Sequence, residues 1–228
     1  MGISLAIEGI DGSGKRTLAE GLKNKFNEIN INSKIISFPR HKEEFSGELV
    51  DKFLYEGLCF NNNQYKEIRE GMLYAIDRMV SLGRIRENGL SLLDEYDSNT
   101  LLIFDRYLSS NFIHRCNNMS NSELKSYIRT MKYIEFHLLG LPEPDITLVL
   151  SVKPEVSYEN IKKRGRQMDD NESIDNLTKS YNNLQKLCEM ENYKMIDCCR
   201  LNEDGKYEML TREEILEKAW KALDMHIV

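Results

Sequence analysis

The sequence predicts a three-layer α/β fold, in which helices cover both faces of a five-stranded parallel sheet. Apolar segments of strand length alternate along the chain with segments whose apolar residues recur at helical spacing. Several of the strand-length segments are apolar throughout, which is typical of strands that are covered on both faces. A glycine-rich run also separates the first strand-length segment from a helical pattern. This alternation indicates a parallel sheet with helices as crossover connections.

The elements follow in a regular order. The expected strands are Ser4–Glu8, Lys34–Phe38, Leu101–Asp105, Ile146–Ser151 and Lys194–Cys198. Helices are expected between them because apolar residues share one face in four sets: Leu18, Leu22 and Phe26; Ile68, Met72, Ile76 and Met79; Leu177, Tyr181, Leu184 and Leu187; and Ile215, Ala219 and Leu223. Ligands of such folds bind at the carboxyl ends of the strands. Motifs that directly follow a strand are therefore candidates for a functional site.

Composition narrows the class of protein. The chain has 228 residues, of which 41% are hydrophobic, and it shows no linker or internal repeat, so we expect a single domain. A net charge of −6 argues against bulk binding of nucleic acid. No apolar run approaches the roughly 20 residues of a membrane helix, and Met1 leads directly into the first expected strand without a signal-peptide pattern. The five cysteines lack C-x-x-C spacing, so we expect reduced thiols and a cytoplasmic location.

The run from Glu8 to Thr17 follows the first expected strand and contains a phosphate-binding loop. Gly9, Gly14 and Lys15 fit the pattern G-x-x-x-x-G-K, in which backbone N–H groups surround an anion at the start of a helix. We expect the loop to bind the phosphates of a nucleotide through Gly9, Ile10, Asp11, Gly12, Ser13, Gly14, Lys15, Arg16 and Thr17. The pattern continues with a Ser or Thr that ligates Mg²⁺. Here that position is Arg16, and Thr17 comes one residue late.

Two other strand ends carry polar motifs. The second expected strand ends in Phe38-Pro39-Arg40, where the proline fixes a turn and the arginine projects toward the cleft. The third ends in Asp105-Arg106-Tyr107, where the carboxylate could hold Mg²⁺ through water and the guanidinium could clamp a phosphate. A structural ion pair between Asp105 and Arg106 explains this second motif equally well.

Two further motifs lie on helices. Tyr74 and Arg78 share a helix face, where an aromatic ring can stack on a base while a guanidinium donates to a carbonyl on its edge. A Tyr–Arg surface pair is the commoner outcome of this spacing. Basic residues followed by acidic ones over residues 162–173 are typical of a mobile lid whose Arg164 and Arg166 neutralise phosphate charge, although a helix end with solvated charges gives the same pattern.

Together these motifs resemble those of the thymidylate kinase family, whose members transfer a phosphoryl group from ATP to dTMP. The matching segments are Glu8–Lys15, Phe38–Arg40, Asp77-Arg78, Asp105–Tyr107 with Ser110-Asn111, and Leu141–Asp145. They occur in the family's order from residue 4 to about residue 172, and only the phosphate loop is specific when taken alone. The resemblance implies the fold of the phosphate-loop nucleoside monophosphate kinases and a homodimer.

The resemblance also implies roles for individual residues. Catalytic roles fall on Lys15, Arg16, Asp11, Arg106, Arg164 and Arg166. The acceptor dTMP would be bound by Phe38, Arg40, Tyr74, Arg78, Arg106, Ser110, Asn111 and His114, with Asn111 at one edge of the base. Mg²⁺ would be held with the help of Asp11, Asp105 and Glu172.

Three positions depart from the family pattern. Since a guanidinium cannot ligate a cation, our hypothesis is that Arg16 acts as an arginine finger on the transferred phosphoryl group. His114 stands where the family usually has a tyrosine that crowds the 2′ position of the sugar. Tyr74 stands where the family often has phenylalanine, so its hydroxyl is extra.

Two alternative functions remain. The first is a related kinase that acts on dUMP or a 5-modified dUMP, because Arg78 and Asn111 favour a thymine-like base without excluding these. The second is a nucleotide-binding module without phosphoryl transfer, for which an acceptor site would have no purpose.

Overall fold

The computed structural model describes residues 3–41, 45–60, 65–85, 87, 89, 91–94, 100–117, 119–165 and 172–227, with side chains up to residue 223. The middle of the expected lid, residues 166–171 with Arg166, lies outside the described residues.

A five-stranded parallel sheet forms the centre of the molecule. Its strands are β1 (Ser4–Gly9), β2 (Asn32–Ser37), β3 (Thr100–Asp105), β4 (Ile146–Ser151) and β5 (Lys194–Asp197). Their order across the sheet is β2-β3-β1-β4-β5, and every neighbouring pair is parallel. The predicted fold class and all five predicted strands are confirmed. All residues of β1, β3 and β4 are buried, as expected of central strands with both faces covered.

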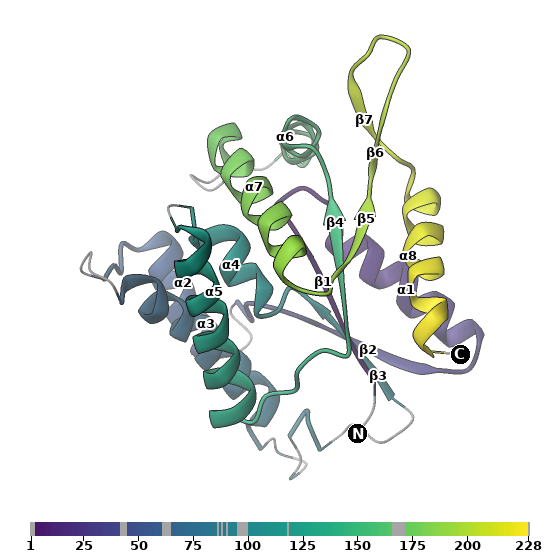
Figure 1. Ribbon diagram of the computed structural model, residues 1–228. Coiled ribbons are helices and arrows are strands. Elements are labelled where there is room, and N and C mark those ends of the chain that lie inside the picture. Colours follow the sequence, from purple (N-terminus) through teal and green to yellow (C-terminus); the bar gives the residue numbers. More distant parts are fainter. Residues whose placement is uncertain are drawn as a thin grey trace.

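Helices cover both faces of this sheet (Figure 1). On one face α1 (Lys15–Glu28) and α8 (Arg212–Ile227) pack in one hydrophobic cluster with alternate residues of the strands, including Leu5 and Ile7. A second cluster occupies the opposite face, where the helices are α2 (Phe45–Tyr55), α3 (Lys66–Gly83), α4 (Ser109–Arg115), α5 (Asn121–Lys132) with the π-helical turn η1 (Tyr133–Leu138), and α7 (Ile174–Met190). The shorter α6 (Pro154–Lys162) follows β4 and lies beyond its carboxyl end (Figure 1).

Helix α3 buries a different face from its apolar stripe. Ile68, Met72 and Ile76 are half-buried and Met79 is 36% exposed, whereas Asp77 and Arg78 are buried. The physical reason is that both charged side chains have partners inside the molecule, which removes most of the cost of burying them. The apolar stripe of this helix is therefore only partly buried, with Ile68 and Met72 packed against the core cluster.

An antiparallel hairpin, β6 (Cys199–Leu201) and β7 (Tyr207–Met209), was not predicted. Each strand has three residues, which is too short to give a clear period of two. The hairpin follows β5 and projects beyond the carboxyl end of the sheet (Figure 1).

Two compositional expectations can be compared with the structure. All five cysteines lie among the described residues, and each is a free thiol. Within the described part of the chain, no helix is both long and apolar enough to span a membrane.

Candidate active site

The phosphate loop connects β1 to α1 and depends on glycine for its shape. Gly12 and Gly14 have φ angles of +79° and +88°, in the left-handed region that favours glycine. A Cβ atom on Gly12 would also lie 2.5 Å from the carbonyl oxygen of Ser157, so a side chain does not fit there. Helix α1 begins at Lys15 immediately after Gly14, which places the positive end of its dipole at the loop. The predicted strand, loop and helix are thus all present.

Lys15 is buried inside this loop. Its Nζ donates to the carbonyl oxygens of Gly9 and Ile10, both at 2.8 Å. Burial lowers the pKa of Lys15 to about 7, and the nearby positive charge of Arg106 acts in the same direction. An added phosphate group would favour the charged form of this lysine.

Glu8, at the start of the phosphate loop, is linked by hydrogen bonds to the beginning of helix α4. Its fully buried carboxylate accepts hydrogen bonds from the backbone N–H of Tyr107 at 2.8 Å, the N–H of Ser110 at 3.1 Å and the Ser110 hydroxyl at 2.6 Å. Burial raises the pKa of Glu8, although these bonds oppose the shift. The predicted substrate residue Ser110 is therefore also a structural partner of Glu8.

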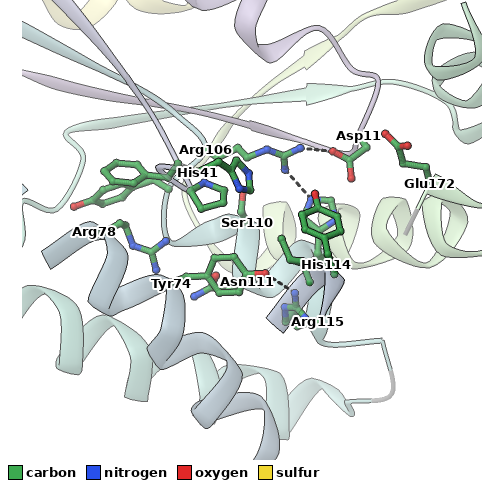
Figure 2. Close-up of a pocket in the computed structure, with 15 residues that line it drawn as sticks. Asp11, His41, Tyr74, Arg78, Arg106, Ser110, Asn111, His114, Arg115 and Glu172 are labelled. Atoms are coloured by element: carbon green, nitrogen blue, oxygen red, sulfur yellow. Dashed lines mark hydrogen bonds and ion pairs between the residues drawn. The ribbon is translucent and has the colours of Figure 1, made fainter. Parts of the chain in front are cut away.

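A first cavity of about 220 Å³ opens beside the loop (Figure 2). It is lined by Asp11, Phe38, Pro39, His41, Leu54, Tyr55, Tyr74, Arg78, Arg106, Tyr107, Ser110, Asn111, His114, Arg115 and Glu172. Seven of the eight residues expected at the acceptor are therefore brought together from β2, α3, β3 and α4. The exception is Arg40, which does not line this cavity and whose backbone N–H donates to Asp77 at 2.9 Å.

Arg106 lies at the centre of the polar contacts in this cavity. Its backbone has a φ of +68°, which is rare for a residue other than glycine and is typical of functional sites. Its guanidinium forms an ion pair with Asp11 and donates to Nε2 of His114 at 3.1 Å (Figure 2). Burial by itself would raise the pKa of Asp11, but the charges of Arg106 and Lys15 hold it well below its usual range. Burial lowers the pKa of His114 to about 3, so this imidazole is neutral.

Arg78 is oriented by a buried carboxylate. Its Nε and Nη2 donate to the two carboxylate oxygens of Glu135 at 2.7 and 2.6 Å, and the side chains are 2% and 0% exposed. Glu135 belongs to η1, the π-helical turn that extends α5. Such a bidentate pair fixes the plane of the guanidinium.

Asn111 carries a buried amide without an internal partner. The residue is 3% exposed, lines the cavity, and its Nδ2 makes no hydrogen bond within the described structure. Buried polar atoms usually have partners, so an unpaired donor in a cavity indicates a ligand acceptor.

A second cavity, of about 560 Å³, lies on the other side of the phosphate loop. Its lining residues are Gly12, Ser13, Gly14, Thr17, Leu18, Gly21, Asn160, Arg164, Met209, Leu210, Thr211, Arg212, Glu213, Ile215 and Leu216. Four of the expected nucleotide-binding residues and the expected lid residue Arg164 thus share this cavity. The unpredicted hairpin and the start of α8 supply its other wall.

Arg16 and Asp105 line neither cavity. The side chain of Arg16 is 59% exposed, and it donates to Glu20 at 2.8 Å and to the hydroxyl of Ser37 at 2.7 Å. Ser37 in turn donates to Asp105 at 3.1 Å, so these residues form a chain across the ends of β2 and β3.

The three residues expected to help hold Mg²⁺ are not gathered in one place. Asp11 and Glu172 both line the first cavity, whereas Asp105 lies outside it and accepts a hydrogen bond from the Ser37 hydroxyl. Among the described residues, no three or more His, Cys, Asp or Glu side chains form a group that could hold a metal ion. Two carboxylates in one cavity still suit Mg²⁺, which commonly binds one or two carboxylates together with substrate phosphates and water.

Sequence reasoning missed Leu54, Tyr55 and Arg115 of the first cavity, and Glu135, which orients Arg78. Arg115 lies four residues after Asn111 on α4, and this spacing on a helix was a signal that could have found it. Glu135 gave no local signal, because it is 57 residues from Arg78.

The fold and the two cavities define a class of protein. A phosphate loop at the carboxyl end of a parallel sheet, with a separate charged cavity beside it, is the arrangement of a phosphate-loop nucleoside monophosphate kinase. The family model described as thymidylate kinase matches residues 7–207, and the chain therefore belongs to the thymidylate kinase family.

Comparisons with individual proteins agree with this assignment. The chain is 29% identical over 178 residues to thymidylate kinase from Mycobacterium tuberculosis, covering 75% of this chain and 76% of the relative. It is 28% identical over 218 residues to a probable thymidylate kinase from Sulfolobus acidocaldarius, covering 95% and 93%. A solved structure of thymidylate kinase from Candida albicans is similar in fold, with a TM-score of 0.66 and 20% identity over 98% of this chain and 92% of that one.

Proposed function

We propose that this protein transfers the γ-phosphoryl group of ATP to the phosphate of dTMP, giving dTDP and ADP. The observation that carries the proposal is the division of the phosphate loop between two cavities. Asp11 lines the first cavity and its neighbour Gly12 lines the second, and Lys15 is buried within the same loop. A donor in the second cavity and an acceptor in the first would meet at the loop.

The first cavity suits a thymine base. Thymine has two carbonyl acceptors and one N–H donor on its ring edge, and Asn111 offers an amide that can both donate and accept. Arg78 supplies a fixed donor nearby, while Tyr74 and Phe38 supply aromatic surface. The amino group of cytosine would meet a donor at the position of a thymine carbonyl, so we expect discrimination against dCMP.

Positioning and charge neutralisation would carry the catalysis. The acceptor phosphate is already anionic near neutral pH, so it needs no strong general base. Arg106 would hold this phosphate, and Lys15 and the loop N–H groups would hold those of the donor. Arg164 lines the donor cavity and would add positive charge there.

We also propose that Mg²⁺ takes part, with Asp11 and Glu172 as the protein groups closest to its site. Magnesium, when bound, supplies positive charge to the phosphate oxygens. The support is the chemistry of two carboxylates in the acceptor cavity. We propose Asp105 as a water-mediated ligand of this ion, for which the hydrogen bond that it accepts from Ser37 would have to break.

A cytoplasmic homodimer completes the proposal. Free thiols at all five cysteines support the location. The half-buried apolar stripe of α3 and the exposed residues Tyr133 (56%) and Leu138 (61%) support an interface between copies. Light scattering on the purified protein should give twice the mass of the chain, and a monomeric mass would contradict the dimer.

Formation of ADP from ATP and Mg²⁺ with each acceptor in turn tests the function. The panel contains dTMP, dUMP, UMP, dCMP, dGMP and thymidine. We expect dTMP to give the highest kcat/KM and thymidine none. Turnover of dUMP in preference to dTMP would support the related kinase. The ratio of kcat/KM for dUMP over UMP measures how strongly the site, with His114 near the sugar, selects deoxyribose over ribose. ATP binding without turnover of any acceptor would instead support a nucleotide-binding module that transfers no phosphoryl group.

A further inference from the structure

Arg115 joins three helices beside the acceptor cavity (Figure 2). It is the last residue of α4, and its Nη2 donates to the hydroxyl of Tyr74 on α3 at 2.5 Å. Its Nη1 lies 3.3 Å from a carboxylate oxygen of Glu70, one helical turn before Tyr74 on the same helix. Its guanidinium carbon lies 4.5 Å from the ring centre of Phe53, on α2, and 5.2 Å from that of Tyr74.

These contacts restrain the ring of Tyr74 from several directions. The hydrogen bond from a charged donor fixes the hydroxyl end of the ring, and such bonds are stronger than those between neutral groups. The ion pair with Glu70 fixes the guanidinium in turn, and Phe53 packs against Tyr74 in an edge-on arrangement with ring centres 6.4 Å apart. Arg115 and Phe53 thereby hold the ring of Tyr74 from two sides, and Arg115 alone donates to its hydroxyl among the hydrogen bonds of the described residues.

The arrangement concerns the acceptor because Tyr74 and Arg115 both line the first cavity. The side chain of Arg115 is only 18% exposed, and its pairing with Glu70 compensates the charge. Within the described part of the chain, its hydrogen bonds, ion pair and ring contacts reach Glu70, Tyr74 and Phe53 and not the phosphate loop. The group that Arg115 holds is therefore the aromatic surface of the acceptor cavity.

We propose that Arg115 is a positioning residue for the acceptor, which holds the Tyr74 ring as the platform on which the base stacks. This inference rests on the proposed function and deepens it, since it names the group that orients the expected base-stacking ring. Stacking uses the face of a base and is insensitive to the groups on its edge. Arg115 therefore sets affinity for pyrimidine acceptors in general, whereas Asn111 and Arg78 set the choice among them.

A double-mutant cycle tests the proposal. The variants are Y74F, which removes only the hydroxyl, R115M, which removes the guanidinium, and the combination of the two. We expect Y74F to raise the KM for dTMP about 3-fold and R115M about 10-fold, because complete loss of stacking on one aromatic side chain costs about 5- to 150-fold and both variants retain the ring. Adding Y74F to R115M should change the KM no further, because both substitutions remove the same hydrogen bond.

Three further readouts separate positioning from a general structural role. The KM for dUMP should rise by the same factor as that for dTMP, while kcat and the KM for ATP stay unchanged. R115K should fall between wild type and R115M, because an ammonium can donate to Tyr74 without pairing well with Glu70 at the same time. The matched control is R200M, which also loses ion pairs, to Glu208 at 2.8 Å and Glu214 at 2.9 Å, but lines neither cavity.

The outcomes divide clearly. Independent effects that multiply in the double variant, an unchanged KM for dTMP in R115M, or a change confined to one base would each overturn the proposal. If R115M does not fold, Y74F measures the same hydrogen bond from its other end, and an unchanged KM there overturns the proposal. If the wild type phosphorylates another pyrimidine nucleotide instead of dTMP, the proposed function fails, while the same cycle with that acceptor decides the role of Arg115.

Discussion

The two cavities that meet at the phosphate loop are built from different kinds of groups. In the first cavity, three arginines each have a carboxylate partner: Arg78 with Glu135, Arg106 with Asp11 and Arg115 with Glu70. The second cavity is formed by the glycine-rich backbone, apolar side chains of α1 and α8, the end of the hairpin, and a few charged side chains that include Arg164. Side chains that are held in advance can read a particular ligand, whereas backbone N–H groups recognise any phosphate. We therefore expect substitutions in the first cavity to change binding of the acceptor, and substitutions at the loop to change the rate.

The largest expected effect concerns Arg16, which lines neither cavity in the structure. If Arg16 is an arginine finger, its side chain leaves Glu20 and Ser37 when the donor binds, and R16S lowers kcat about 10³-fold. Nucleotide binding should weaken much less, as measured by titration calorimetry with ATP. Glu20→Gln is the matched control, because it removes the resting partner of Arg16 without removing the guanidinium. An R16S enzyme with the kcat of the wild type would dispose of the arginine-finger hypothesis.

Next in size is the loss of the buried pair behind the acceptor cavity. Glu135→Gln leaves the charge of Arg78 without its carboxylate, and breaking such a pair typically costs about 3–5 kcal/mol of unfolding free energy. Urea denaturation measures this change. The control is Glu208→Gln, which breaks an exposed pair with Arg200 and should cost about 1 kcal/mol or less. Equal losses in the two variants would mean that the Arg78–Glu135 pair is not a supporting element of the acceptor cavity.

A smaller effect should appear in acceptor selectivity. Asn111→Leu removes the unpaired amide but keeps a side chain of similar size, so we expect the KM for dTMP to rise about 10-fold, corresponding to about 1.4 kcal/mol. The ratio of kcat/KM for dTMP over dCMP should fall, while the KM for ATP is retained. Asn32→Ala, on the exposed edge strand β2, provides a control. Weaker ATP binding in Asn111→Leu would contradict the assignment of the acceptor to the first cavity and the donor to the second.

The smallest effect is a change in protonation at the boundary between the cavities. With a pKa lowered to about 7, Lys15 is mostly neutral in the free protein at pH 8, and donor phosphates should restore its charge. ATP binding should then take up most of one proton at pH 8 and almost none at pH 5.5, as calorimetry in buffers of different ionisation enthalpy would reveal. K15M should abolish the uptake at pH 8.

The same shift affects stability. Since the pKa of Lys15 is lowered from its ordinary 10.5, the unfolded chain binds more protons than the folded one between about pH 7 and pH 10.5. The contribution of Lys15 to the unfolding free energy therefore rises with pH across this window. Comparison of wild type and K15M by urea denaturation at pH 7 and pH 9 isolates this contribution.

Local patterns in the sequence determined the sheet and the phosphate loop. The three central strands were predictable because buried parallel strands are largely apolar, and the loop because glycines with positive φ are required wherever the chain turns tightly around an anion. The motifs at the ends of β2 and β3 and on α3 and α4 also identified most of the acceptor cavity, since the carboxyl ends of parallel strands lie at one edge of the sheet.

Tertiary structure alone decided which charged groups are paired. The inward face of α3 depends on Glu135, on Ser46 and on the backbone of Arg40, which contact Arg78 and Asp77 from distant segments. The orientation of the Arg16 side chain depends on its hydrogen bond to Ser37. The orientation of the Tyr74 ring depends on Arg115, which belongs to a helix that begins 35 residues after Tyr74. Burial of a charge is favourable only where a partner is supplied, and periodicity along one segment carries no information about a partner on another.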